Sequence, residues 1–156
     1  MPKDDSQSLT VRRTIRASPE FLFDAWTQPA RLLAWWGPEG VKCIDAAVDL
    51  RIGGDYRLGN RLPDGTMLWI SGTFEAVDRP RRLVYSWMLE GKRTTAERVT
   101  VRFEPGDAGT EVIVLHERIA DDELRRGHAL GWKGCLDGLT RFSEDSPSVS
   151  DVETSR

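Results

Sequence analysis

Cysteine is scarce in this chain, where only Cys43 and Cys135 occur among 156 residues. They form neither a CxxC pair nor a spacing typical of metal ligands. A disulfide-rich secreted scaffold and a zinc ribbon are therefore excluded. We expect free, buried thiols in a reducing cytoplasm, and the sequence alone leaves a bridge between the two open.

Long apolar runs and an excess of one charge are also missing. No stretch approaches the ~20 apolar residues that span a bilayer, and the N-terminal MPKDDSQS lacks the apolar core of a secretory signal. The formal net charge of -3 gives no electrostatic reason to bind nucleic acid or an anionic membrane. We therefore predict a cytoplasmic protein with no nucleic-acid partner and no membrane insertion.

Familiar motifs of catalysis and cofactor binding are missing too. The chain contains no nucleophile elbow, Walker loop, dinucleotide fingerprint or zinc motif. We predict no cofactor, no metal and no catalytic residue. A metal site from His116, His128 and Cys135 is the alternative, but histidines with single hydrogen bonds in a core or pocket fit the pattern better.

What the chain does have is alternation of apolar and polar residues, typical of half-buried strands. Strands are predicted at 9–16, 43–50, 55–61, 67–77, 83–89, 96–104 and 110–118. Tight turns join the last six, so neighbours are antiparallel. The second strand places its apolar residues on one face: Ile44, Ala46, Val48 and Leu50. Between the first two strands, Ser18-Pro19-Glu20 begins one short helix and residues 30–35 form another.

The longest helical pattern is Asp121 to Phe142, which begins at an Asp cap. Its predicted inner stripe is Leu124, His128, Gly131, Cys135, Leu139 and Phe142. Four glycines inside it each cost ~1 kcal/mol relative to alanine. They make sense where a sheet or a ligand lies close to the helix backbone, and we favour sheet packing. The glycines are Gly127, Gly131, Gly134 and Gly138.

Together these elements predict an α+β fold. A curved antiparallel sheet of six to seven strands wraps around the long C-terminal helix, with two short helices after the first strand. We predict one domain at 9–143, with disordered flanks at 1–8 and 144–156. A sheet curved around one helix leaves a cavity where the facing side chains are too few to fill it.

Several short motifs carry a resemblance to a known family. They are Trp35-Trp36-Gly37-Pro38, the stretch 49–54, Ser71-Gly72-Thr73, and His128 with Gly131-Trp132. The chain resembles, over about 9–142, the bacterial single-domain relatives of the activator of the heat-shock-protein-90 ATPase. These belong to the helix-grip superfamily, with START-like lipid-transfer domains, the birch-pollen allergen and polyketide cyclases.

That resemblance implies the helix-grip fold and a hydrophobic pocket under the long helix, but no single activity. In the eukaryotic activator a separate N-terminal domain makes a large share of the chaperone contacts. This chain has no room for such a domain, so a chaperone partner is not expected.

Five of the six tryptophans and both histidines supply most of the candidate pocket, whereas we assign Trp26 to the core. Trp35 and Trp36 are expected at the pocket mouth, and His116 and His128 can each offer one directional contact. The inner or outer position of the face with Trp87 and Tyr85 stays open, and an outer position would indicate a homodimer. The full predicted ligand pocket is Trp35, Trp36, Tyr56, Trp69, Phe74, Trp87, His116, His128, Gly131, Trp132 and Cys135.

Three functions remain open on these residues. The first is a non-catalytic protein that binds a small hydrophobic or aromatic ligand. The second is a cyclase, dehydratase or hydrolase acting on a polyketide-like or aromatic substrate, which needs His116 paired with an Asp or Tyr56. The third is a co-chaperone-like interaction module, which an exposed aromatic patch would favour.

Overall fold

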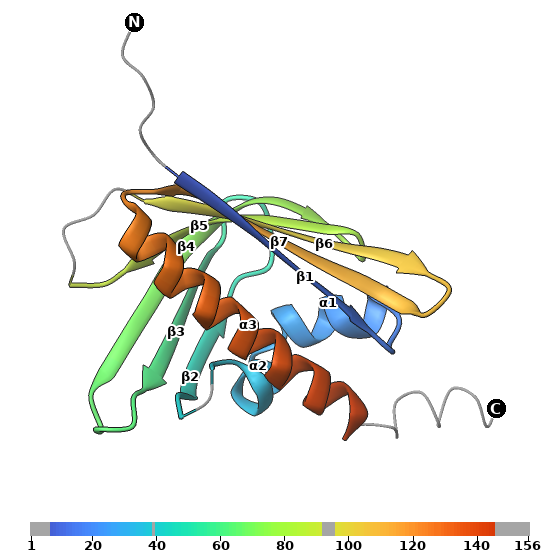
Figure 1. Ribbon diagram of the computed structural model, residues 1–156, viewed down its shortest axis with the longest axis horizontal. Coiled ribbons are helices and arrows are strands. Elements are labelled where there is room, and N and C mark those ends of the chain that lie inside the picture. The colour runs from blue at the N-terminus through green and yellow to red at the C-terminus, as the bar shows by residue number, and fades with distance from the viewer. Residues whose placement is uncertain (1–6, 39, 92–95, 146–156) are drawn as a thin grey trace, which may run out of the picture.

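The computed structural model describes residues 7–38, 40–91 and 96–145. A seven-stranded antiparallel sheet in the order β1-β7-β6-β5-β4-β3-β2 curves around the long helix α3 (Figure 1). Its elements are β1 (Gln7–Ile15), α1 (Pro19–Thr27), α2 (Pro29–Trp35), β2 (Lys42–Val48), β3 (Asp55–Arg61), β4 (Met67–Asp78), β5 (Arg82–Leu89), β6 (Glu97–Gly106), β7 (Gly109–Ile119) and α3 (Asp122–Glu144). The predicted fold class is confirmed.

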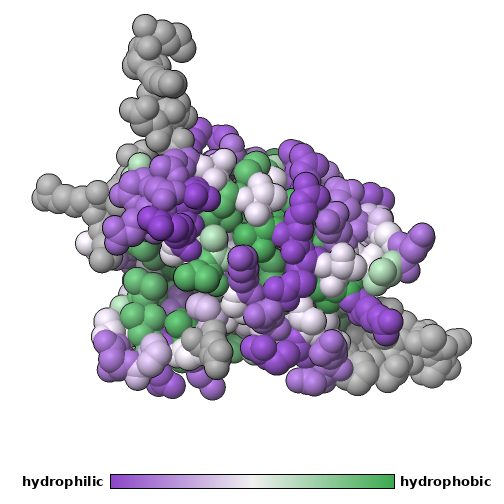
Figure 2. All heavy atoms as spheres, in the orientation of Figure 1, coloured by the Kyte–Doolittle hydropathy of each residue, from purple (hydrophilic) through white to green (hydrophobic). Residues whose placement is uncertain are grey.

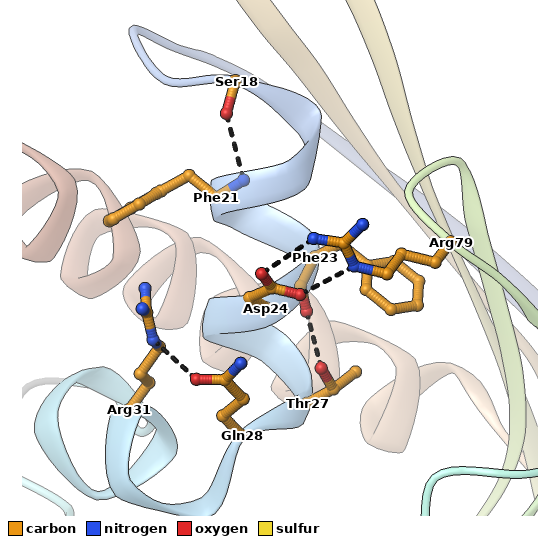
Figure 3. Close-up of polar contacts among 8 residues, drawn as sticks. All are labelled: Ser18, Phe21, Phe23, Asp24, Thr27, Gln28, Arg31 and Arg79. Atoms are coloured by element: carbon orange, nitrogen blue, oxygen red, sulfur yellow. Dashed lines mark hydrogen bonds and ion pairs between the residues drawn. The ribbon is translucent and has the colours of Figure 1, made fainter. Parts of the chain in front are cut away.

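The first helix begins where its capping residues predict. Ser18 accepts a hydrogen bond from the backbone N–H of Phe21 at 3.1 Å, and Pro19 occupies the first turn. Asp24 then accepts two hydrogen bonds from the guanidinium of Arg79, both at 3.0 Å (Figure 3). This bidentate pair ties α1 to the turn between β4 and β5.

The interior between α1 and the sheet is filled by large side chains. Leu22 and Phe23 are fully buried, and the ring of Phe23 meets Phe103 edge-on at 5.8 Å. Trp26 stacks on Trp132 of α3 with centroids 6.0 Å apart. Its indole N–H donates to the hydroxyl of Tyr85 at 3.1 Å, so this buried polar atom is satisfied.

The predicted inner face of β2 holds for Ala46 and Val48, which pack against the core, and is wrong for Ile44 and Leu50. A register shift between Cys43 and Asp45 changes which side chains point inward after that point. Cys43 is buried, whereas Ile44 is 41% exposed. A single bulge thus breaks the period of two, and the strand ends at Val48 rather than at Leu50.

The predicted flanks fall mostly outside the described residues. β1 begins at Gln7, two residues before the predicted strand, and α3 runs on to Glu144. Residues 1–6 and 146–156 are not described.

Both cysteines are free and buried, so no disulfide joins Cys43 to Cys135.

Candidate ligand cavity and buried histidine pair

A cavity of about 180 Å³ lies between α3 and the inner face of the sheet. Side chains from β3, β4 and β5 form one wall, and α3 forms the other. In Figure 2, apolar side chains gather between α3 and the strands on the left of the molecule. The lining is Trp36, Pro38, Val41, Asn60, Leu62, Leu68, Ile70, Trp87, Leu89, Gly127, His128, Gly131, Trp132 and Cys135.

Glycines of α3 keep part of this space open. A Cβ added to Gly127 or Gly131 would meet no atom within 4 Å outside the helix itself. A Cβ on Gly138 would instead lie 2.8 Å from the carbonyl oxygen of Trp35. Gly138 therefore allows close packing, but against the end of α2 and not against the sheet as predicted, whereas Gly127 and Gly131 border the cavity.

Beside the cavity, one buried carboxylate meets two histidines. The same oxygen of Glu97, Oε1, lies 2.7 Å from Nε2 of His116 and 3.0 Å from Nε2 of His128. The two imidazoles stack with centroids 4.4 Å apart and planes 17° from parallel. Glu97 is 6% exposed and His116 is fully buried. This network links the start of β6, the end of β7 and the first half of α3.

Trp132 fixes the tautomer of His116. Its indole N–H, which can only donate, lies 2.9 Å from Nδ1 of His116. Nδ1 must therefore carry the lone pair, and the ring proton must sit on Nε2. That proton donates to Glu97, so His116 is neutral with both nitrogens engaged.

Burial and hydrogen bonding act in opposite directions on this carboxylate. Burial raises the pKa of Glu97, but the hydrogen bonds from His116 and His128 outweigh it and lower the pKa to about 2. Burial lowers the pKa of His116, more than its contact with Glu97 raises it. The cluster thus holds an ionised carboxylate beside a neutral His116.

The ligand atoms of Glu97, His116 and His128 lie within 4.8 Å of one another, as a metal site would require. A metal on Nε2 of His116 needs the lone pair of that atom. The Trp132 hydrogen bond places the proton there instead, so the tautomer does not suit a cation. Cys135 is not part of this cluster, and burial raises the pKa of its thiol to about 12.

Two polar atoms on cavity-lining residues have no hydrogen-bond partner among the described residues. They are Oδ1 of Asn60 and the indole N–H of Trp87. Asn60 is 1% exposed, and its Nδ2 already donates to the carbonyls of Leu58 and Leu68. Most buried polar groups in proteins have a hydrogen-bond partner. Two buried groups without one, both on residues that line the same cavity, are therefore an exception.

Of the predicted pocket residues, six line this cavity: Trp36, Trp87, His128, Gly131, Trp132 and Cys135. Tyr56 and Phe74 lie beside it, around a void of only about 20 Å³. His116 sits behind Trp132, outside the lining. Trp87 and Tyr85 are buried on the inner face, so they do not form the outer patch on which the homodimer prediction depended.

Two predicted residues lie elsewhere. Trp35 is buried, and its indole N–H donates to the carbonyl of Ala25 at 2.8 Å. Trp69 alternates with the cavity-lining Leu68 and Ile70, so it points to the outer face. There the guanidinium of Arg57 covers its ring at 3.8 Å. The alternation alone did not reveal which face was inner.

Glu97 and Asn60 were missed at the sequence level, although a signal existed. Glu97 stands two residues before Val99, on the face that carries Val99, Val101 and Phe103. Asn60 likewise follows Leu58 at a spacing of two. A polar residue that extends an apolar face is the pattern that marks both.

A family model described as activator of Hsp90 ATPase homolog 1-like protein matches residues 16–144. The chain belongs to that family. Members of this Hsp90-activator-like family share the fold seen here, and the predicted resemblance is confirmed. No curated protein matches the sequence.

Solved bacterial structures agree with this family and fold. An AHSA1 protein from Silicibacter pomeroyi is 28% identical, with a TM-score of 0.78 over 86% of this chain and 96% of that one. A protein from Chromobacterium violaceum, 24% identical, has a TM-score of 0.80 over 86% and 94% of the two chains. An AHSA1-like protein from Aeromonas hydrophila, 23% identical, has a TM-score of 0.73 over 90% and 94%. The latter two support the fold alone.

Proposed function

We propose that this chain is a non-catalytic binding protein that holds a small apolar or aromatic molecule under α3. The cavity of about 180 Å³ carries the proposal. An apolar cavity of about 150 Å³ is known to admit benzene, so this one suits a ligand of one or two small rings. Drug-sized ligands need roughly 300 Å³ or more, which argues against steroids in this conformation.

Ligand binding is testable through the tryptophans. Trp36, Trp87 and Trp132 line the cavity, so a bound ring should change their fluorescence and raise the melting temperature. A panel of benzene, indole, naphthalene and short fatty acids covers the expected size range. If no compound moves either signal, the proposal is wrong.

A matched pair of variants locates the bound molecule. Gly131→Leu places a side chain in the cavity, and we expect affinity to fall at least tenfold. Lys133→Leu introduces the same residue at an exposed position of the same helix and serves as the control. Equal binding by both variants would place the ligand elsewhere.

A cytoplasmic location belongs to the same proposal, because both thiols are free. None of the helices in the described part of the chain is long and apolar enough to cross a membrane. A co-chaperone role finds less support, since five of the six tryptophans are buried and Trp69 lies under Arg57.

An enzyme of the cyclase, dehydratase or hydrolase type is the second candidate. The hypothesis named an Asp or Tyr56 as the partner of His116 inside the pocket, whereas the acid beside His116 is Glu97 and His116 lies outside the lining. What favours an enzyme is that the same carboxylate also contacts His128, which lines the cavity. The hydroxyl of Tyr56, the other partner considered, donates to the carbonyl of Ser86. Turnover of a small aromatic thioester or hydroxyketone that disappears in His128→Gln would support this candidate, and no turnover by the unchanged protein would count against it.

A further inference from the structure

His128 is the only histidine that lines the cavity, and one of its ring nitrogens is available. Nε2 lies 3.0 Å from Glu97 Oε1. Nδ1 has no hydrogen-bond partner within residues 7–38, 40–91 and 96–145, and the side chain is 12% exposed. An ionised carboxylate can only accept, so Nε2 carries the proton toward it. In the neutral imidazole, Nδ1 therefore bears a lone pair that a guest in the cavity can meet.

Glu97 places a negative charge beside Nε2 of His128. The carboxylate stays ionised in the fold, and its side-chain contacts among the described residues are to the two histidines rather than to an arginine or lysine. A proton that arrives at Nδ1 of His128 converts a neutral contact into an ion pair with Glu97, which the buried setting strengthens. His116 cannot take this role, because Trp132 occupies its Nδ1.

Trp87 carries an unpaired, buried donor on a ring that neighbours His128. Its ring meets that of His128 edge-on, with centroids 6.2 Å apart, and both residues line the cavity. The Trp87 indole N–H has no partner among the described residues. A guest oxygen that loses its proton gains negative charge, and an N–H donor stabilises that charge more strongly than it stabilises a neutral oxygen.

From these three groups we infer that the cavity takes a small phenol, whose hydroxyl donates to Nδ1 of His128 and gives up its proton there. The O–H bond breaks, its electron pair stays on the phenol oxygen, and the new N–H bond forms at Nδ1. The products are a phenolate in the cavity and an imidazolium beside Glu97, with no change in total charge. This inference rests on the proposed binding function of the cavity.

Nitrophenol reports the transfer directly, because its phenolate absorbs visible light and its phenol form does not. The full-length protein is titrated with 4-nitrophenol from pH 5 to 9 in the presence of EDTA. We expect the bound dye to ionise at least one pH unit below the free dye, a tenfold gain in the phenolate-to-phenol ratio at a fixed acidic pH. Nitrobenzene, which has the same ring and no proton to give, is measured in parallel by tryptophan fluorescence.

Variants separate the roles of the two network residues. His128→Gln has no site for the proton, and Glu97→Gln removes the charge that stabilises the imidazolium. We expect each to lose the shift in the ionisation of bound nitrophenol. Circular dichroism confirms folding, and His128→Gln alone decides the matter if Glu97→Gln does not fold.

The outcomes are distinct. Binding of nitrobenzene with an unshifted or absent nitrophenol complex overturns the phenol inference and leaves the binding function standing. A shift that persists in His128→Gln also overturns it. If neither compound binds, both the cavity function and this inference fail.

Discussion

Residues 127–135 of α3 line a cavity, whereas the next turn of the helix packs into a filled core through Leu136 and Leu139. Leu136 and Leu139 are fully buried, and Gly138 touches the carbonyl of Trp35. Gly127 and Gly131, five and nine residues after the first residue of the helix, face open space. The same residue type thus permits close packing in one half and leaves room in the other. A helix that needed only to close the core would gain from alanine at the second kind of position.

The largest expected difference is between truncating a leucine in the filled core and truncating one on the wall of the cavity. Leu136→Ala should lower the free energy of unfolding by about 2–5 kcal/mol, because a closely packed site cannot collapse around the lost atoms. Leu68 is half-buried on the wall of the cavity. Leu68→Ala should lower the free energy of unfolding by less than about 2 kcal/mol, because atoms pack against only part of this side chain. Urea denaturation of both variants measures the difference.

Equal losses from the two leucine variants would contradict the comparison. They would mean that the cavity collapses in solution and that its wall is packed as tightly as the core. The denaturant slopes must match that of the unchanged protein for the free energies to be compared.

Glycine substitutions give a smaller effect, of opposite sign in the two halves. Gly131→Ala should raise the free energy of unfolding by about 1 kcal/mol, because alanine favours the helix and meets no obstacle. Gly138→Ala should lower it by about 1–3 kcal/mol, because its methyl group collides with the Trp35 carbonyl. Thermal melts of the two variants, which share one chemical change, provide the check.

Stabilisation by Gly138→Ala would show that α2 and α3 can separate at no cost. Loss of stability in Gly131→Ala would show that other atoms lie too close to Gly131 to admit a methyl group. Either result removes the contrast between the halves.

Much of this architecture follows from the sequence, because periodic burial and turn residues act locally. Ser18 and Pro19 start α1, Asp121 caps α3, and the strands from β3 onward begin within a residue of their predicted positions. The bulge in β2 was not predicted, because the alternation of residue types does not show where one extra residue interrupts the strand pairing. After that residue, the side chains that would have pointed inward point outward.

The candidate site was harder to predict than the fold. The predicted stripe on α3 found His128, Gly131 and Cys135, because helical spacing alone places them together. The carboxylate that pairs with His128 lies 31 residues away on another element. Only the strand register, which pairs Val99 with His116, places Glu97 diagonally across from this histidine and beneath the helix. Periodicity carries no information about such pairings.

The smallest expected effect is a dependence of stability on pH, which arises from His116 and Glu97 beside the cavity and not from the filled core. The pKa of His116 is lowered in the fold from an ordinary value of 6.5, so below about pH 6.5 the unfolded chain binds a proton that the folded chain refuses. The free energy of unfolding should therefore fall on acidification through this window, by at most about 1.4 kcal/mol per pH unit for one proton. Glu97 affects stability at lower pH. Its contribution to the free energy of unfolding is complete above about pH 4.5 and is lost as the pH falls toward its folded pKa of about 2.

Urea titrations between pH 7.5 and 5 test the first window, with two variants for reference. His116→Gln removes the titrating group and should flatten the slope that His116 contributes, even though the variant is less stable at every pH. Leu136→Ala, in the filled half, should be less stable yet keep the slope of the unchanged protein, because its contacts are apolar. A slope unaltered by His116→Gln would mean that His116 gains a proton freely in the fold. The Trp132 hydrogen bond to its Nδ1 could not then persist, and the tautomer on which the cavity chemistry depends would be lost.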